Sequence, residues 1–216
     1  MAWLIFGDSH IWTFKYADEK GWIRQPCDFI EVMGATAVGL RNPNGQTNAL
    51  EIFAQGLLPP REQFTPVMQL GEVDCGFVIW WRAMKLAESV DAQLETSINA
   101  HFGFVDRLLS EGYSTVVLTG AALPTIRDGQ DWGEIANKRR EVVTSLVERT
   151  QLTMRYNAML RDGAARRGLP FIDISSEIID RATGVISDAF RAEDPLDHHL
   201  NSERAGRLWA TALNAL

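Results

Sequence analysis

The sequence has few cysteines, no long apolar run and no surplus of basic residues. Cys27 and Cys75 are its two cysteines among 216 residues, too few for a disulfide framework or a metal cluster. Residues 1–6 lack a basic segment and lead at once into polar residues, and no later apolar run is long enough to span a bilayer. We therefore expect a reduced, soluble, cytoplasmic protein with no membrane partner.

Acidic residues outnumber basic ones, 28 against 21, which gives a formal net charge of −7 at pH 7. An acidic surface repels phosphate backbones, so a nucleic-acid partner is not expected. The hydrophobic content of 46% excludes intrinsic disorder. With no repeat and no Gly/Ser linker, residues 1–216 are expected to form one domain, whose oligomeric state the sequence leaves open.

Short apolar runs alternate with longer segments of helical period. The runs expected to be buried strands are Ala2–Phe6, Asp28–Met33, Pro66–Leu70, Thr115–Thr119 and Pro170–Ile174. Helices are expected over 48–55, 77–89 and 94–109, over 134–166 as one long helix or two pieces, and in a last helix that Asn201 caps. This alternation predicts a doubly wound α/β fold, which binds ligands at the carboxyl ends of its parallel strands.

Two segments carry the residues that serine hydrolysis requires. Gly7-Asp8-Ser9-His10 follows the first strand, so Ser9 is expected at a strand-to-helix turn near backbone N–H groups. The loop Asp194–Asn201, before the last helix, holds two acids and two of the four histidines. A serine nucleophile needs a base to take its proton and an acid to orient that base. His10, next to Ser9, is a candidate pocket residue.

These blocks resemble the SGNH, or GDSL-type, hydrolases. The resemblance implies a three-layer α/β/α sandwich with a flavodoxin-like five-stranded parallel sheet, and it implies that Ser9 is the nucleophile. The family's second block contains a glycine whose N–H stabilises the oxyanion. The segment Gly34–Leu40 resembles that block, with Gly39 as the favoured donor and Gly34 as the second choice. The family's chemistry requires no cofactor and no metal.

The third block departs from the family pattern. The family has Gly-x-Asn-Asp, in which the Asn side chain is a further oxyanion donor, whereas Val73 stands at that position in Gly71-Glu72-Val73-Asp74. Losing one such donor costs roughly two to three orders of magnitude in turnover unless it is replaced. The nearby polar run offers amides that could replace it: Asn42, which is the nearest to the glycine block, Asn44 and Asn48.

The acid and base also depart from the common Asp-x-x-His spacing. Asp197 precedes His199 by two positions, and His199 is followed by Leu-Asn and a helix, as in the family. We therefore favour His199 as the base and Asp197 as its orienting acid, with Asp194 and His198 as the competing pair. Asp8 and Asp74 are interpreted as acceptors for backbone amides rather than as a metal pair.

The resemblance implies a serine esterase or deacylase that acts on a small-molecule or glycan ester through an acyl-enzyme. A short acyl group, on a sugar for example, is the family-level expectation. Two alternatives stay open from the sequence. An acyltransferase would use the same triad, and a catalytically silent binding module would keep only the fold.

Overall fold

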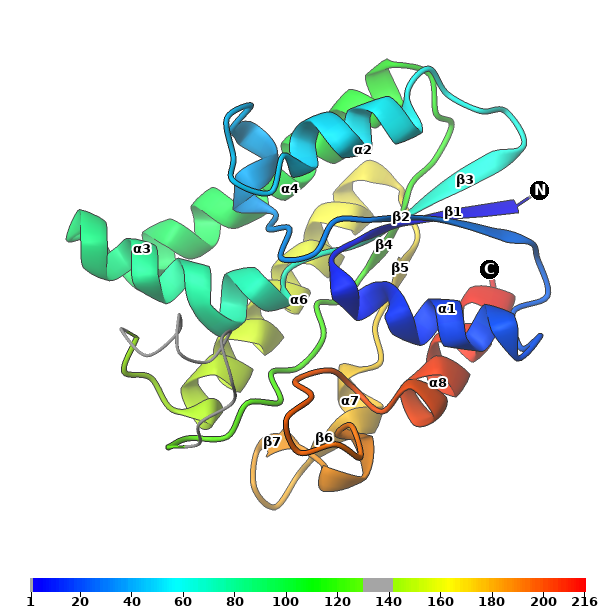
Figure 1. Cartoon of the computed structure of the whole chain (residues 1–216). Helices are drawn as coiled ribbons and strands as arrows, with labels where there is room; N and C mark the ends of the chain where they lie inside the picture. The colour runs from blue at the N-terminus through cyan, green and yellow to red at the C-terminus, as the bar shows by residue number, and fades with distance from the viewer. Residues whose placement is uncertain (1, 130–141) are drawn as a thin grey trace.

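The centre of the molecule is a five-stranded parallel sheet, seen in a computed structural model that describes residues 2–129 and 142–216 (Figure 1). Its strands are β1 (Ala2–Gly7), β2 (Cys27–Glu31), β3 (Phe64–Gln69), β4 (Val117–Thr119) and β5 (Phe171–Ile172). They lie in the order β2-β1-β3-β4-β5, and every neighbouring pair is parallel. The five predicted strands are confirmed. The strand order reverses between β1 and β3, where such sheets bind ligands.

Helices cover both faces of the sheet (Figure 1). On β1, Leu4 and Phe6 pack into one buried cluster, while Trp3 and Ile5 point to the other face and pack into a second. The first cluster includes side chains of α2 (Ala49–Leu57), α4 (Val90–Ser110) and α6 (Leu146–Arg167). The second includes side chains of α1 (Trp12–Glu19) and α8 (Ser202–Asn214). The predicted three-layer α/β/α sandwich is therefore confirmed.

The predicted helices are confirmed in part. The segment predicted over 77–89 divides into a π-helical turn, η3 (Asp74–Val78), and α3 (Ile79–Leu86). Of the segment predicted over 134–166, residues 134–141 lie outside the described residues, and residues 142–145 are not helical. The α6 helix starts at Leu146, where Ser145 and Glu148 form a capping box that fixes its first turn. Asn201 caps α8, as predicted.

Several short elements between β5 and α8 were not predicted. They are α7 (Ser175–Ile178), the antiparallel pair β6 (Ile179–Asp180) and β7 (Val185–Ile186), and η4 (Asp188–Phe190). Two-residue strands carry too little alternation to be read from a sequence. They lead into the loop before α8, which lies beside the carboxyl end of β1. Among the helices of the described residues, none combines the length and apolarity needed to cross a membrane.

Candidate active site

Ser9 lies where β1 ends, at the start of the short helix η1 (Ser9–Ile11). Gly7 is required there because a Cβ atom at this position would lie 2.0 Å from the carbonyl oxygen of Gln69. The Asp8 carboxylate accepts the backbone N–H of His10 at 2.9 Å and caps η1, as predicted. These two residues force the chain into a tight turn. In this turn Ser9 is buried, with 7% of its surface accessible to solvent.

The loop before α8 brings a histidine and a carboxylate to this serine. The distance from Ser9 Oγ to His199 Nε2 is 2.8 Å, and that from His199 Nδ1 to Asp197 Oδ1 is 2.6 Å. The same Asp197 oxygen accepts the backbone N–H of His199 at 2.9 Å. With its proton on Nδ1, His199 accepts the hydroxyl proton of Ser9 through Nε2. The arrangement has the connectivity of a serine hydrolase triad.

Burial and neighbouring charges shift the pKa values of both His199 and Asp197. Burial, followed by the charge of His10, lowers the pKa of His199 below its ordinary value of 6.5, although the hydrogen bond that its ring donates to Asp197 opposes this. Burial raises the pKa of Asp197, but the hydrogen bonds and charges of His199 and His198 together outweigh it and lower that pKa. At neutral pH the pair is therefore a neutral imidazole and a carboxylate, the forms that a general base and its orienting acid need.

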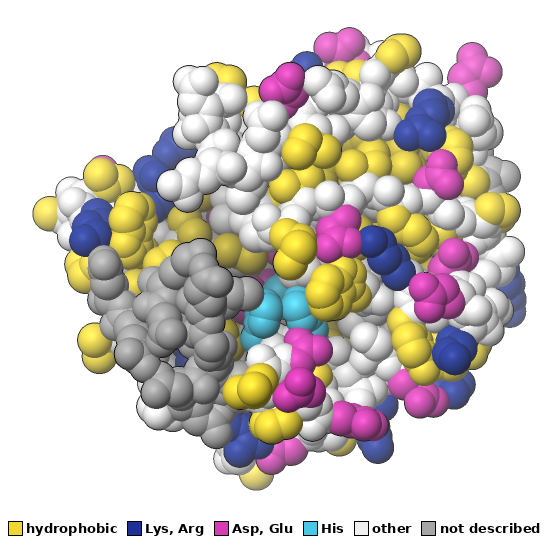
Figure 2. Space-filling model, viewed as in Figure 1, with side chains coloured by type: hydrophobic (Ala, Val, Ile, Leu, Met, Phe, Trp, Pro, Cys, Tyr) yellow, Lys and Arg dark blue, Asp and Glu magenta, His cyan; other side chains and the backbone are white. Residues whose placement is uncertain are grey.

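Three aromatic side chains surround the His199 ring. Trp12 stacks on it at 4.5 Å between ring centroids, and the rings of His198 and His10 lie 4.1 Å and 5.1 Å from it. Figure 2 shows histidine side chains reaching the surface in the middle of this face, with acidic side chains directly beside them. Asp194, the competing acid, accepts the backbone N–H of Leu196 instead. The geometry thus joins Ser9 to His199 and Asp197, and not to the alternative pair.

Several solved structures with a similar fold are named as lipases or hydrolases. A GDSL-like lipase from Bacteroides thetaiotaomicron matches with a TM-score of 0.61 at 15% identity, over 100% of this chain and 89% of that chain. An extracellular lipase from Streptomyces rimosus matches with 0.55 at 14%, over 100% and 99%. Phospholipase A1 from Streptomyces albidoflavus matches with 0.54 at 14%, over 99% and 98%. This chain has the SGNH-hydrolase fold. No family model and no curated protein sequence matches it.

The SGNH pattern requires N–H donors for an oxyanion, and here the structure differs from the expectation for Gly39. The Gly39 N–H donates to the carbonyl and the hydroxyl of Thr36, at 3.1 Å and 3.0 Å, inside the turn that starts η2 (Val38–Arg41). The N–H of Gly34 has no acceptor in residues 2–129 or 142–216. Gly34, at φ +69°, lines the same cavity of about 510 Å³ as Ser9. Gly39 lines this cavity as well, so the two glycines differ in that the Gly39 N–H already has an acceptor in Thr36.

The third-block position faces this cavity as well, because Val73 lines it together with Ser9. Asn42, the expected replacement donor, does not line it. Its carboxamide oxygen accepts the backbone N–H of Asn44 in a local turn, and its side chain lines the neighbouring cavity. The structure therefore does not place Asn42 as expected. Gln46 and Thr47 line the Ser9 cavity instead, and as ordinary loop residues they carry no sequence signal.

Asp74 holds the loop that forms one wall of the cavity. Its two carboxylate oxygens accept the N–H groups of Ala37 and Val38 at 2.7 Å and 3.0 Å, and the hydroxyl of Ser97 at 2.7 Å. Burial raises its pKa, although these hydrogen bonds act in the opposite direction. Asp74 is therefore an acceptor for backbone amides, as predicted. The hydrogen bonds to Ala37 and Val38 connect the second-block segment, Gly34–Leu40, to the third-block segment, Gly71–Asp74.

A set of metal-type donors coincides with the candidate triad. Asp197, His198 and His199 each offer one donor atom within 4.8 Å of the others. The oxygen of Asp197 and Nδ1 of His199 are already bonded to each other, and His199 Nε2 is bonded to Ser9. A cation at this cluster would have to break the Ser9–His199–Asp197 chain. The absence of a metal and of a cofactor stays a prediction from the resemblance.

Proposed function

We propose that the protein is a serine ester hydrolase in which Ser9 is the nucleophile, His199 the general base and Asp197 its orienting acid. The observation that carries the proposal is the continuous chain of two short contacts, Ser9 Oγ to His199 Nε2 at 2.8 Å and His199 Nδ1 to Asp197 Oδ1 at 2.6 Å. The fold supports the same chemistry, because the matching structures include lipases and a phospholipase.

The proposed reaction has two steps. Ser9 Oγ attacks the ester carbonyl while His199 takes its proton, and the same proton then passes to the departing alcohol as the carbon–oxygen bond breaks. Water attacks the acyl-enzyme, giving up a proton to His199, and Ser9 leaves with that proton as the free acid forms. Asp197 holds the Nδ1 proton on its side of the ring throughout and stabilises the imidazolium.

The backbone N–H groups of Ser9 and Gly34 are the proposed oxyanion donors. Both residues line the cavity of about 510 Å³ into which the carbonyl would enter, and neither N–H has an acceptor in the described residues. Pre-oriented donors of this kind stabilise the charge that develops on the carbonyl oxygen. A short acyl group and a sugar as the alcohol part stay predictions from the resemblance.

The proposal is tested by replacing the nucleophile. Ser9→Ala should reduce hydrolysis of p-nitrophenyl acetate and of acetylated sugars to the background rate, and it should abolish labelling by a fluorophosphonate probe. Ser110→Ala is the matched control, since Ser110 is exposed and its hydroxyl donates, among the described residues, only to the carbonyl of Arg107. Wild-type turnover by the Ser9→Ala variant would refute the assignment.

The two alternatives make different predictions for the same assays. A silent binding module, which the Val73 substitution favours, would leave Ser9 unlabelled in folded protein. An acyltransferase would label Ser9 but deliver the acyl group to an added alcohol. A hydrolase should label Ser9 and release free acid at a rate that a competing alcohol does not change.

A further inference from the structure

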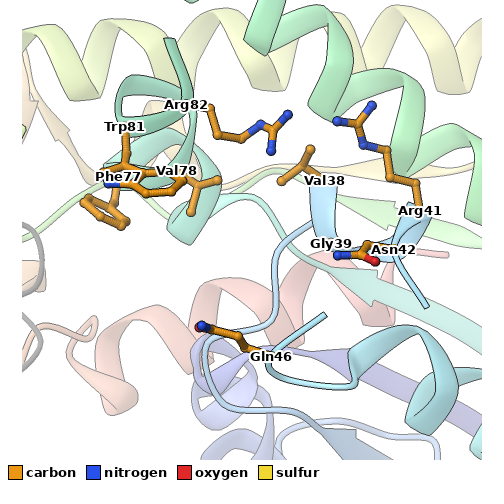
Figure 3. Close-up of a pocket in the computed structure, with 9 residues that line it drawn as sticks. All are labelled: Val38, Gly39, Arg41, Asn42, Gln46, Phe77, Val78, Trp81 and Arg82. Carbon is orange, nitrogen blue, oxygen red and sulfur yellow. The ribbon is translucent and has the colours of Figure 1, made fainter. Parts of the chain in front are cut away.

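A second cavity of about 740 Å³ adjoins the candidate active site (Figure 3). We propose that it binds a carboxylate or phosphate group of the ester substrate, an inference that rests on the proposed hydrolase function. Its walls come from η2 and α3 and from the loop between β2 and α2. The two cationic side chains that line it are Arg41 and Arg82.

Within the part of the chain that the structure describes, no carboxylate neutralises the two guanidinium groups. Neither Arg41 nor Arg82 forms an ion pair with a carboxylate of residues 2–129 or 142–216, whereas other arginines do, such as Arg167 with Asp106 and Arg155 with Asp91. In Figure 3 the guanidinium groups of Arg41 and Arg82 extend toward each other at one end of the cavity. Like charges facing a shared cavity repel, and an anion between them relieves that repulsion.

Arg82 is held in position by a buried partner. Its Nε donates to Gln93 Oε1 at 2.7 Å, and Gln93 is only 2% exposed. Gln93 is in turn bonded to Glu88 through its amide nitrogen. The terminal nitrogens of Arg82 make no hydrogen bond within the described residues, which leaves them available to a ligand. Guanidinium groups arranged in this way suit carboxylate and phosphate oxygens, to which they donate in pairs.

The cavity is positioned to receive one end of a substrate whose ester lies at Ser9. Four residues line both this cavity and the one at Ser9: Gly39, Gln46, Phe77 and Val78. The shared wall therefore includes apolar side chains, and Trp81 lies beside Phe77 at 6.5 Å between ring centroids. An ester fits this arrangement if an apolar or aromatic segment, which would contact the shared wall, separates its carbonyl from its anionic group.

The charge of the whole protein makes this site stand out. A chain of net charge −7 repels an anionic substrate at long range, so recognition of an anion depends on local cations. Two arginines that pair with no carboxylate of the described residues, in one cavity next to the proposed nucleophile, meet that requirement. The chemistry gives no preference for a carboxylate over a phosphate, and the two are separated by experiment.

The test compares matched anionic and neutral esters. Para-acetoxybenzoate and its methyl ester place the anion on the alcohol part, and the mono-para-nitrophenyl ester of terephthalate and its methyl ester place it on the acyl part. Para-acetoxyphenyl phosphate adds the phosphate arm. In at least one pair, wild-type kcat/KM should favour the anionic ester by about tenfold or more, and added salt should reduce the preference.

Arg41→Gln and Arg82→Gln should each reduce the anionic-to-neutral ratio of kcat/KM, and the double variant should bring it close to one. Arg166→Gln is the matched control, since Arg166 is an exposed arginine that lines none of the cavities described above, and it should keep the wild-type ratio. A wild-type enzyme that hydrolyses these esters without anionic preference in any pair would overturn the proposal. So would a preference that survives in the double variant.

Direct binding separates this proposal from the proposed hydrolase function. Para-acetoxybenzoate should bind to the Ser9→Ala variant in a calorimetric titration, and the added Arg41→Gln and Arg82→Gln changes should weaken that binding by about tenfold or more. If the wild type hydrolyses none of the esters but this difference in binding is found, the hydrolase function fails and the anion site stands. Equal binding with and without the arginines overturns the anion site alone.

Discussion

Asp197→Asn removes one negative charge from the candidate triad and little else. The Asp197 oxygen accepts two hydrogen bonds, from the ring and from the backbone N–H of His199, at 2.6 Å and 2.9 Å. An asparagine oxygen can accept both, so the loop should keep its shape. The variant therefore isolates the electrostatic contribution of the carboxylate to the imidazolium that forms during the reaction.

The size of that contribution follows from Coulomb's law and solvent exposure. Opposite unit charges about 4 Å apart attract by about 4 kcal/mol at an effective dielectric constant of about 20. The Asp197 side chain is 37% exposed, so solvent screens part of this attraction. A loss of about 2 to 3 kcal/mol of transition-state stabilisation remains, which lowers kcat by roughly a hundredfold. KM should change much less, because the imidazolium exists mainly in the transition state.

The assay is the initial rate of p-nitrophenyl acetate hydrolysis at neutral pH, with the thermal midpoint of each variant as a check on folding. Asp194→Asn is the matched control. It makes the same chemical change three residues earlier in the loop, where the carboxylate only caps a turn at Leu196. An Asp197→Asn enzyme with unchanged kcat would refute the reasoning. Equal losses in the two variants would do the same.

Three further predictions concern charges near the site and in the core. His10→Gln should move the rising limb of the pH–rate profile to higher pH, since the charge of His10 lowers the pKa of His199; an unmoved limb would contradict that coupling. Asp74→Asn should lower the free energy of unfolding by about 1 to 3 kcal/mol in urea titrations, because one buried N–H loses its acceptor; an equally stable variant would show that the loop has another anchor. Burial lowers the pKa of His101 to about 3, so below about pH 6.5 the unfolded chain binds more protons than the folded one. As the pH falls from about 6.5 to about 3, the free energy of unfolding should therefore decrease by roughly 1.4 kcal/mol per pH unit. In His101→Leu that part of the slope should be absent, and an identical slope would mean that other groups cause it.

A structural feature could be predicted from the sequence where it depends on residues close together in the chain. Continuous apolar runs located the five strands, and Asn201 was recognisable as a cap because its side chain bonds a residue three positions away. Ser9 and His199 could be paired before the structure only through the family resemblance. They lie 190 positions apart in the sequence, and no local pattern around either residue indicates that their side chains meet.

The remaining features depend on packing between distant segments. The Gly39 donor was a reasonable prediction from the second block, but the N–H direction is decided by the turn that Thr36 closes. The cavity with Arg41 and Arg82 is lined by η2, η3 and α3, which are distant in the sequence, and no short motif links the two arginines. The position at which α6 starts depends on the Ser145 cap, while the helical pattern of the sequence alone left one long helix or two pieces open.

Val73 and the two arginines together predict which esters the enzyme hydrolyses fastest. With valine in place of the third-block amide, the proposed oxyanion donors are the two backbone N–H groups of Ser9 and Gly34, and one missing donor costs roughly two to three orders of magnitude in turnover. A substrate anchored by an anionic group can recover part of this loss, since binding energy far from the carbonyl can be used to orient the ester. Small neutral esters have no such anchor. We therefore expect slow turnover of p-nitrophenyl acetate by an enzyme whose Ser9 is still labelled by a fluorophosphonate, and turnover as fast as that of the best anionic ester would refute this link between the two cavities.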